Sequence, residues 1–443
     1  MKVIVIGGVA AGMSAASKLK RLVKNVEIVV YEKGEVLSYG ACGMPYFISD
    51  EIKDANRLVA RTKEKFEESG IKVNIFHEVI EVNDSLNQVT VKDLTNNTII
   101  TDNYDYLIVG SGASPRKLNI EGENLGNIFN LNSFEDGINI KEQALKDEVK
   151  DIVIVGGGFI GIELVEAFKH LNKNVTLIEH SDHILSIFDE DITVPLENHL
   201  RDKNVILKLG ESATRFIGNT NVTKVVTKNG EYKADLVVVA IGITPNTSFL
   251  TKSNVILSTN KAVEVNRTMQ TNISNIYAAG DCSMIFHKVL YKTVYLPMGH
   301  NANKQGRIVA ENIAGINTKL NGVLGTTVIK VIDMEAAKTG LTEKEAKLNN
   351  IDYGTEIITG RNHAGYYPNA TKVTIKVIYD KTTKMLLGAE MVGYKDTAIR
   401  INIFALAIHN KMTSRELGFT DLAYAPPFAG VWDVTQVAAN KIK

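Results

Sequence analysis

The feature that most constrains the fold is a strand, glycine turn, helix and strand pattern that the chain contains twice. The first copy, residues 3–32, reads VIVIGGVAAGMSAASKLKRLVKNVEIVVYE, and the second, residues 152–179, reads IVIVGGGFIGIELVEAFKHLNKNVTLIE. In each copy an apolar, β-branched run leads into glycines, a stretch of helical period follows, and a second apolar run ends in glutamate. This pattern is typical of a βαβ unit, so the sequence predicts an α/β fold built on parallel sheets.

The glycines of each copy indicate what the turn binds. The first allows a tight turn, the second lets the backbone approach a pyrophosphate, and the third lets helix and strand pack closely. The second copy has all three, whereas the first has Val9 at the middle position. Free N–H groups of the helix attract phosphates, and the closing glutamate can accept hydrogen bonds from ribose hydroxyls. We expect two Rossmann-like (doubly wound) nucleotide-binding domains, with contacts from Gly7, Gly8, Ala10, Gly12, Glu32, Gly156, Gly158, Ile160, Gly161 and Glu179.

Two dinucleotide sites in one chain indicate two cofactors that exchange electrons, and three further segments favour FAD at the first site. Residues 104–115 and 234–246 each read as a strand that ends in a glycine loop, and residues 271–283 end a strand at Gly280–Asp281. This last turn can place a carboxylate and a helix N-terminus against the polyol and phosphates of a flavin cofactor. With Val79 added, the predicted contacts from this part of the chain are Val79, Gly112, Gly242, Gly280 and Asp281.

The closing acid of the second copy also indicates which nicotinamide nucleotide binds there. Glu179 can hold the adenosine ribose, and no arginine lies near position 180 to accept a 2′-phosphate. His180 and His183 could partly take that role. The sequence therefore favours NADH, with NADPH possible.

Composition narrows the partners and the compartment. The chain has 50 basic and 50 acidic residues, so no basic excess indicates nucleic-acid binding. Its two cysteines cannot form a disulfide framework, and no apolar stretch approaches the ~20 residues of a membrane helix. The N-terminal run MKVIVIGG is too short for the core of a signal peptide. We expect a cytoplasmic protein that binds small molecules, with no nucleic-acid, membrane or metal partner.

The glycine turns, SYGACGMPYF at 38–47 and AYAPPF at 423–428 make the chain resemble a known family. It is similar to the FAD-dependent pyridine nucleotide–disulfide oxidoreductases, and among them to the single-cysteine branch of coenzyme A-disulfide reductases, NADH oxidases, NADH peroxidases and polysulfide reductases. The resemblance implies a discontinuous FAD-binding domain (1–110 and 246–322), an NAD(P)H-binding domain (111–245) and an α+β C-terminal dimerisation domain (323–443). In the last segment the sequence predicts a capping box from Thr342 to Glu345 and a hairpin at 372–393.

Cys42 is the residue to which the resemblance assigns the chemistry. Two-cysteine relatives separate their cysteines by four residues, and the second position here is Phe47, so an intramolecular redox disulfide cannot form. Pro45 is well placed to open a helix, and a thiol beside a helix N-terminus has its pKa lowered. We predict that Cys42 is catalytic and cycles as a thiolate, a mixed disulfide with a small thiol, or a sulfenic acid. The other cysteine, Cys282, is interpreted as a small packed residue.

The resemblance also implies where a substrate binds. Coenzyme A needs cationic partners for its phosphates, and by family position these lie on the first helix and near residue 303. Tyr424 would reach the flavin and thiol site of the partner subunit in a homodimer, which makes it a second catalytic candidate. The substrate-binding residues assigned in this way are Ser14, Lys18, Arg21, Ser38, Asn303, Tyr366 and Tyr367, and for the two tyrosines plain interface packing is an equal alternative.

Single residues favour one branch of the family and leave others open. Ala10 stands where peroxidases and water-forming oxidases usually carry histidine, and Pro45–Tyr46 resembles the coenzyme A-disulfide reductases. Trp432 stands where some of those reductases have lysine, which keeps an NADH oxidase or a polysulfide reductase open as alternatives. We predict a flavoprotein that passes electrons from NAD(P)H through FAD to Cys42, which reduces coenzyme A disulfide or a similar small disulfide. A non-catalytic redox-sensing flavoprotein is the remote alternative.

Overall fold

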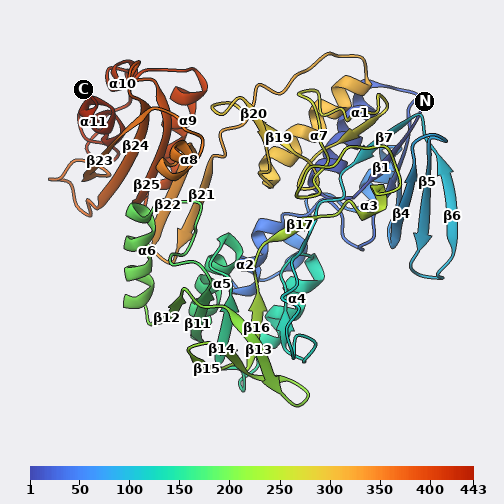
Figure 1. Cartoon of the computed structure of the whole chain (residues 1–443), viewed down its shortest axis with the longest axis horizontal. Helices are drawn as coiled ribbons and strands as arrows, with labels where there is room; N and C mark the ends of the chain where they lie inside the picture. The colour runs from blue at the N-terminus through green and yellow to red at the C-terminus, as the bar shows by residue number, and fades with distance from the viewer.

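The first glycine-turn unit lies at the centre of a parallel sheet. In the computed structural model, which describes residues 1–443, β1 (Lys2–Ile6), α1 (Ala10–Leu22) and β2 (Glu27–Tyr31) follow one another, and β1 pairs in parallel with β2 and with β7 (Tyr106–Val109). The sheet has the order β18-β7-β1-β2-β3, so β18 (Ile276–Ala278) joins it from far along the chain. The first lobe therefore combines two separate stretches of sequence, blue and yellow in Figure 1.

The rest of the first lobe extends this sheet and covers it. α7 (Gly299–Ile313) packs along α1, and a three-stranded antiparallel sheet, β4-β5-β6, adjoins the parallel one. The remaining elements up to the second lobe are η1 (Ala41–Gly43), α2 (Met44–Ile48), η2 (Ala55–Leu58), α3 (Lys63–Glu68), β3 (Lys72–Asn74), β4 (His77–Asn83), β5 (Gln88–Asp93), β6 (Ile99–Asn103) and β8 (Ala113–Pro115). After β17 (Ile243–Pro245) the chain returns through η3 (Ser248–Leu250), β18, β19 (Ile285–His287) and β20 (Lys292–Val294).

The second unit builds the second lobe by the same rule. β10 (Asp151–Val155), α5 (Phe159–His170) and β11 (Asn174–Glu179) form the crossover, and the sheet order is β12-β11-β10-β16-β9. The apolar residues of β10 and β16 are buried because both faces of the sheet are covered. The other elements are β9 (Ile128–Phe129), α4 (Phe134–Ala144), α6 (Glu190–Asp202), β12 (Val205–Leu209), β13 (Ala213–Gly218), β14 (Val222–Thr227), β15 (Gly230–Lys233) and β16 (Leu236–Val239).

The C-terminal lobe is a five-stranded antiparallel sheet with helices against it, in the order β21-β22-β25-β24-β23. Thr342 and Glu345 form the predicted capping box at the start of α8, and β24 and β25 form the predicted hairpin. The elements are β21 (Thr327–Val331), β22 (Met334–Gly340), α8 (Glu343–Leu348), β23 (Tyr353–Arg361), β24 (Lys372–Asp380), β25 (Leu386–Gly393), η4 (Ala398–Arg400), α9 (Ile401–His409), α10 (Ser414–Gly418) and α11 (Val434–Lys441). The α+β character predicted for this segment is confirmed.

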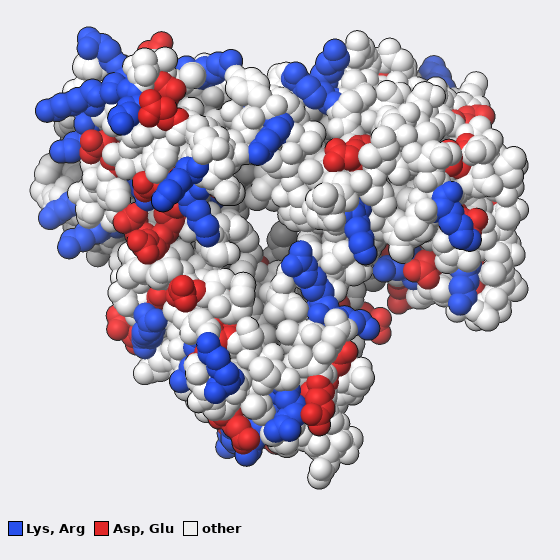
Figure 2. All heavy atoms as spheres, viewed as in Figure 1, with Lys and Arg blue, Asp and Glu red and all other residues white.

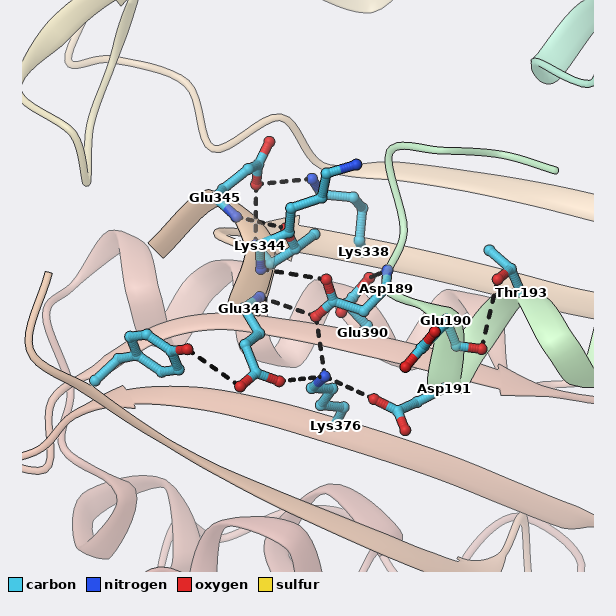
Figure 3. Close-up of polar contacts among 12 residues, drawn as sticks. Asp189, Glu190, Asp191, Thr193, Lys338, Glu343, Lys344, Glu345, Lys376 and Glu390 are labelled. Carbon is cyan, nitrogen blue, oxygen red and sulfur yellow. Dashed lines mark hydrogen bonds and ion pairs between the residues drawn. The ribbon is translucent and has the colours of Figure 1, made fainter. Parts of the chain in front are cut away.

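The three lobes are joined by packed side chains and by ion pairs. One apolar cluster includes Met44, Phe47 and Ile48 of α2 together with core residues of the second and C-terminal lobes. α6 of the second lobe lies against the C-terminal sheet, and charged residues connect the two, as Figure 3 shows. The predicted domain boundaries themselves stay predictions. No helix has both the length and the hydropathy needed to cross a membrane.

Candidate functional site

A cavity of about 3010 Å³ lies where the three lobes meet, and Figure 2 shows the surface hollowed there. A pocket for one small ligand typically measures about 300–1,000 Å³, so this cavity has room for several molecules. Eleven of the predicted site residues line it: Gly7, Gly8, Glu32, Cys42, Gly112, Gly156, Gly158, Ile160, Glu179, Gly242 and Asp281. The two glycine turns and Cys42 thus face one continuous space.

The two glycine turns have nearly the same backbone geometry. Gly7 has φ 102° and Gly156 has φ 113°, in the left-handed region that favours glycine. A Cβ on Gly161 would lie 1.9 Å from the carbonyl oxygen of Gly156, which is the close helix–strand approach expected of the third glycine. A Cβ on Gly158, by contrast, would meet nothing within 4 Å. The fold does not require glycine at 158, and the open space there fits an approaching pyrophosphate.

The closing glutamates hold the glycine turns in place. Glu32 accepts hydrogen bonds from the amides of Gly8 at 2.6 Å and Gly34 at 2.7 Å. Glu179 accepts from the amides of Gly157 at 2.5 Å and Ser181 at 2.8 Å. Burial acts to raise the pKa of Glu179, but these hydrogen bonds outweigh it and lower the pKa. Both carboxylates lie at a cavity wall, and each oxygen can accept a further hydrogen bond from a ribose hydroxyl.

Asp281, in the turn after β18, has the surroundings expected of a residue that contacts a flavin cofactor. Its Oδ1 atom is buried without a hydrogen-bond partner, although the residue lines the cavity, and burial raises its pKa. Asn301, near the start of α7, has an unpartnered Nδ2 atom and also lines the cavity. Buried polar groups normally find partners, so these two atoms suit a polar ligand such as the polyol of FAD.

One expectation about this turn is wrong. The sequence predicted that the Gly280–Asp281 turn leads from a strand into a helix, but the chain continues into the hairpin of β19 and β20. The next helix along the chain is α7, which begins at Gly299, and its N-terminus lines the cavity. Cys282 is fully buried, and its thiol donates to the Val109 carbonyl at 3.4 Å, as expected of a packed residue. Gly280 donates its amide hydrogen to Gln305 Oε1 and does not line the cavity.

Cys42 is held between two lobes by the helix that follows it. It lies in η1, and Pro45 occupies the first turn of α2, as predicted. α2 packs against α4 and α5 of the second lobe, whereas the chain before η1 belongs to the first lobe. The side chain of Cys42 is exposed to the cavity. The thiol therefore lies at the junction of the two nucleotide-binding lobes.

The prediction that the pKa of Cys42 is lowered is wrong for the chain without cofactors. Burial by the surrounding walls raises the pKa, and the negative charges of Glu163 and Asp281 raise it further. α2 is only five residues long, so its N-terminus offers a small dipole, and a backbone hydrogen bond alone acts in the opposite direction. Within the chain, no positively charged side chain offsets these effects on the pKa of Cys42.

Glu163 is a candidate that sequence reasoning missed. It lies on α5, two residues after Gly161, and it lines the cavity. Burial, and then the charge of Glu166, raise the pKa of Glu163 to about 7. Perturbed carboxyl groups of this kind collect at functional sites. The available signal was the occurrence of two acidic residues, Glu163 and Glu166, in the mostly apolar run FIGIELVEAF.

The predicted coenzyme A face of α1 lies outside this cavity. Ser14 Oγ accepts a hydrogen bond from Asn303 Nδ2 at 2.7 Å, and Lys18 Nζ lies 3.1 Å from Glu311 Oε1. Arg21 is exposed on the same helix. The face is therefore polar and is formed by α1 and α7. Of its two predicted cations, Lys18 is already paired with Glu311.

Two further predicted residues, Ser38 and Val79, are held by backbone hydrogen bonds or by core packing. Ser38 adopts φ 46°, and its backbone bonds to the Gly8 carbonyl and to the Ala60 amide, each at 2.9 Å. Val79 on β4 lies in the core of the first lobe. The predicted residues that do not line the cavity are Ala10, Gly12, Ser14, Lys18, Arg21, Ser38, Val79, Gly161, Gly280, Asn303, Tyr366, Tyr367 and Tyr424.

Three predicted tyrosines lie on the C-terminal lobe and do not line the cavity that contains Cys42. Tyr366 Oη lies 3.3 Å from Tyr424 Oη, and the two residues are 77% and 47% exposed. The Tyr367 ring packs edge-on against His363. Tyr366 and Tyr424 are called the tyrosine pair below, and Tyr367 follows Tyr366 in the chain.

Comparison with known proteins agrees with this geometry. Residues 1–306 match the family described as pyridine nucleotide-disulphide oxidoreductase, and residues 326–434 match its dimerisation domain. The NAD(P)H sulfur oxidoreductase (CoA-dependent) of Pyrococcus abyssi is 40% identical over 443 residues, which cover 100% of this chain and 98% of that protein. The coenzyme A disulfide reductase of Staphylococcus epidermidis is 31% identical over 443 residues, 99% of each chain. The solved structure of a NAD-dependent persulfide reductase from A. fulgidus has a TM-score of 0.96 and 36% identity, across 100% of this chain and 83% of that one.

The chain belongs to the pyridine nucleotide-disulphide oxidoreductases. It is an FAD- and NAD(P)H-dependent oxidoreductase, and the predicted family, enzyme class and fold class are confirmed. The roles of individual residues stay predictions.

Proposed function

We propose that this enzyme uses NADH to reduce coenzyme A disulfide, or a similar small disulfide, at Cys42. The observation that carries the proposal is the position of Cys42. It is the one cysteine open to the cavity, and it lies between the lobes that carry the two dinucleotide turns. The only other cysteine is fully buried. Thiol exchange needs an accessible sulfur, so Cys42 is the residue that can perform it.

The proposed reaction uses the single sulfur of Cys42 in two steps. The Cys42 thiolate attacks one sulfur of the disulfide, a new S–S bond forms, and the other half leaves as a thiolate that takes up a proton. Two electrons and a second proton then cleave the mixed disulfide and release the second thiol. FAD, when bound at the first glycine turn, would supply those two electrons after taking them from NADH. Glu163 lines the same cavity and, with a pKa of about 7, can hold or release a proton there.

Glu179 supports the preference for NADH. Its carboxylate lies in the cavity wall at the end of β11 and is already the acceptor for two backbone amides. A 2′-phosphate near that carboxylate would meet like charge, whereas a ribose hydroxyl would donate to it. His180 Nδ1 also bonds to Glu179, at 2.8 Å, so that ring nitrogen is already engaged with the carboxylate. The ratio of kcat/KM for NADH and NADPH tests this point.

A homodimer completes the proposed site. Tyr366 and Tyr424 are exposed and do not line the cavity of their own chain, and they lie on the lobe that matches a dimerisation domain. We place this pair at the thiol site of the partner subunit, where a tyrosine hydroxyl can donate a hydrogen bond to the leaving thiolate. The predicted cytoplasmic location and the absence of nucleic-acid and membrane partners stay part of the proposal.

Reduction of a coenzyme A persulfide or polysulfide is the second candidate. It is favoured by the relative from Pyrococcus abyssi, which is more similar to this chain than the coenzyme A disulfide reductase from Staphylococcus epidermidis. Trp432, half exposed, stands where some coenzyme A-disulfide reductases have lysine. Cys42 would perform the same thiol exchange, and the sulfane sulfur of the persulfide would take the place of the second thiol of the disulfide.

The deciding experiment compares acceptors side by side. Steady-state rates with NADH are measured for coenzyme A disulfide, for coenzyme A persulfide and for oxygen, on the FAD-loaded protein. The proposal expects coenzyme A disulfide to give the highest kcat/KM. A higher value with the persulfide selects the second candidate, and a higher value with oxygen shows that the chain is an NADH oxidase.

A further inference from the structure

Two loops of the C-terminal lobe carry the tyrosine pair. Residues 362–371 link β23 to β24 and carry Tyr366, and residues 419–433 link α10 to α11 and carry Tyr424. Both side chains point outward, and the only direct hydrogen bond between the two loop backbones is the long one from the Ala364 amide to the Pro426 carbonyl, at 3.4 Å. Some other group must keep these loops at a fixed separation.

One buried arginine is bonded to both loops. Arg400, on η4, donates from Nη2 to the Asn362 carbonyl at 2.5 Å and to the Phe428 carbonyl at 2.6 Å. Its Nε donates to Asp433 Oδ2 at 3.1 Å, and Nη1 donates to the Asp396 carbonyl. The side chain is 10% exposed. Asn362 precedes Tyr366 by four residues and Phe428 follows Tyr424 by four, so the guanidinium joins each loop four residues along the chain from its tyrosine.

We propose that Arg400 is a positioning residue, which sets the Tyr366–Tyr424 pair at the distance needed for thiol exchange at Cys42 of the partner subunit. The inference rests on the proposed function, because it requires the pair to act at that thiol. Arginine suits the task because its planar fork of donors reaches several acceptors at once. Lysine could keep the charge beside Asp433, but its single ammonium cannot span both carbonyls in the same geometry.

Asp433 does not depend on Arg400 for its other partners. Its Oδ1 atom caps α11 by accepting from the Thr435 amide at 2.9 Å. Replacing Arg400 by lysine therefore leaves an ammonium near the carboxylate and keeps the helix cap. The Arg400→Lys variant should fold and dimerise, while the loops lose their common anchor.

The test compares Arg400→Lys and Arg400→Gln with Arg201→Lys, a control at an exposed arginine on α6. All are measured as FAD-loaded protein. We expect kcat for NADH-dependent reduction of coenzyme A disulfide to fall about a hundredfold in both Arg400 variants, because small misplacements of a reacting group have effects of that size. NADH-dependent reduction of ferricyanide, which takes electrons directly from flavin, should stay within about twofold of the wild type. The Arg201→Lys variant should match the wild type in both assays.

The lysine variant separates positioning from stability. If Arg400 only stabilises the fold, an Arg400→Lys variant that melts at the wild-type temperature should also reduce coenzyme A disulfide at the wild-type rate. That result overturns the inference. If Arg400→Gln fails to fold, the comparison of Arg400→Lys with the wild type still decides the question.

A double-mutant cycle separates this inference from the proposed function. In a Tyr424→Phe background, Arg400→Lys should lower the rate no further, because both changes act through the same hydroxyl. Full additivity of the two effects, or a slow Tyr424→Phe variant alongside a fast Arg400→Lys variant, overturns the inference alone. A Tyr424→Phe variant with wild-type disulfide turnover overturns the role proposed for the tyrosine, and the inference with it.

Discussion

Cys42 and Glu163 line the same cavity, and the charge on the carboxylate raises the pKa of the thiol. Glu163 has a pKa of about 7, so this effect is absent well below pH 7 and present above it. Glu163→Gln removes the charge, and the pKa of Cys42 should fall. We expect alkylation of NADH-reduced protein by iodoacetamide at pH 8 to become roughly two- to threefold faster, because the thiolate is the reactive form.

The comparison at two pH values provides the control for that prediction. At pH 6 the wild-type Glu163 carries a proton, so the variant and the wild type should react at similar rates. Equal rates at pH 8 as well, or a slower variant, would show that the carboxylate does not influence the thiol.

For single residues, the sequence indicated which side chains lie at the site, but it gave the wrong direction for the pKa of Cys42. Cys42 and the glycine turns could be found because their chemistry depends on local order along the chain. The pKa of Cys42 could not, because burial and the charge of Glu163, a residue 121 positions away, determine its direction. Arg400 gave no sequence signal, since its partners are backbone carbonyls in two distant loops.

The elements themselves give the next test, because two glycines of the second βαβ unit have different tasks. Gly158 has free space where a Cβ would lie, whereas Gly161 is in tight contact with Gly156. Gly158→Ala should leave the melting temperature nearly unchanged and raise the KM for NADH about tenfold, which corresponds to ~1.4 kcal/mol of binding. Gly161→Ala should lower the free energy of unfolding by about 1–3 kcal/mol through overpacking.

Thermal unfolding of the apoprotein and steady-state kinetics of the FAD-loaded protein check both variants. If Gly158→Ala destabilises the protein as much as Gly161→Ala does, the open space at 158 is not reserved for a ligand.

The repeated strand–turn–helix elements were predictable because each forms from consecutive residues with clear apolar periods. The turn at Gly280–Asp281 was not, because its glycine and acid resemble the start of a helix. The residues that follow it instead pair with β20, through contacts that the turn sequence does not reveal. α2 was predicted from Pro45, but its packing on the second lobe, which places Cys42 between lobes, depends on the tertiary fold.

Across the whole molecule, the second and C-terminal lobes meet at a charged cluster, shown in Figure 3. Lys376 on β24 is 3% exposed and lies 3.1 Å from Asp189, 2.7 Å from Asp191 and 2.7 Å from Glu343. Glu390 is fully buried beside it and accepts a hydrogen bond from the Asp189 amide at 2.9 Å. Burial, and then the neighbouring Asp189, raise the pKa of Glu390 to about 9.

That raised pKa makes the stability depend on pH in a defined direction. In the unfolded chain Glu390 has its usual pKa of 4.5, so unfolding releases its proton at any pH between 4.5 and about 9. The contribution of Glu390 to stability is therefore full below pH 4.5 and falls as the pH rises toward 9. Glu390→Gln mimics the neutral form, so the variant should melt at a higher temperature than the wild type at pH 8 and at a similar temperature at pH 5.

Melting temperatures measured across that range, with FAD bound, check the prediction. A variant that melts below the wild type at pH 8 would show that ionised Glu390 stabilises the contact between the lobes. The sequence could not indicate this cluster, because its members come from α6, α8, β24 and β25 and meet only in the folded chain.

If electrons from NADH reach a disulfide only through Cys42, replacing that one cysteine must stop disulfide reduction. The rate of NADH-dependent reduction of coenzyme A disulfide is compared for wild-type, Cys42→Ser and Cys282→Ser proteins, each loaded with FAD. Cys42→Ser should lose this activity while it still reduces ferricyanide with NADH, since a serine hydroxyl cannot form a mixed disulfide. Cys282→Ser should keep both activities. Undiminished disulfide reduction by the Cys42→Ser variant would show that electrons reach the disulfide without this thiol.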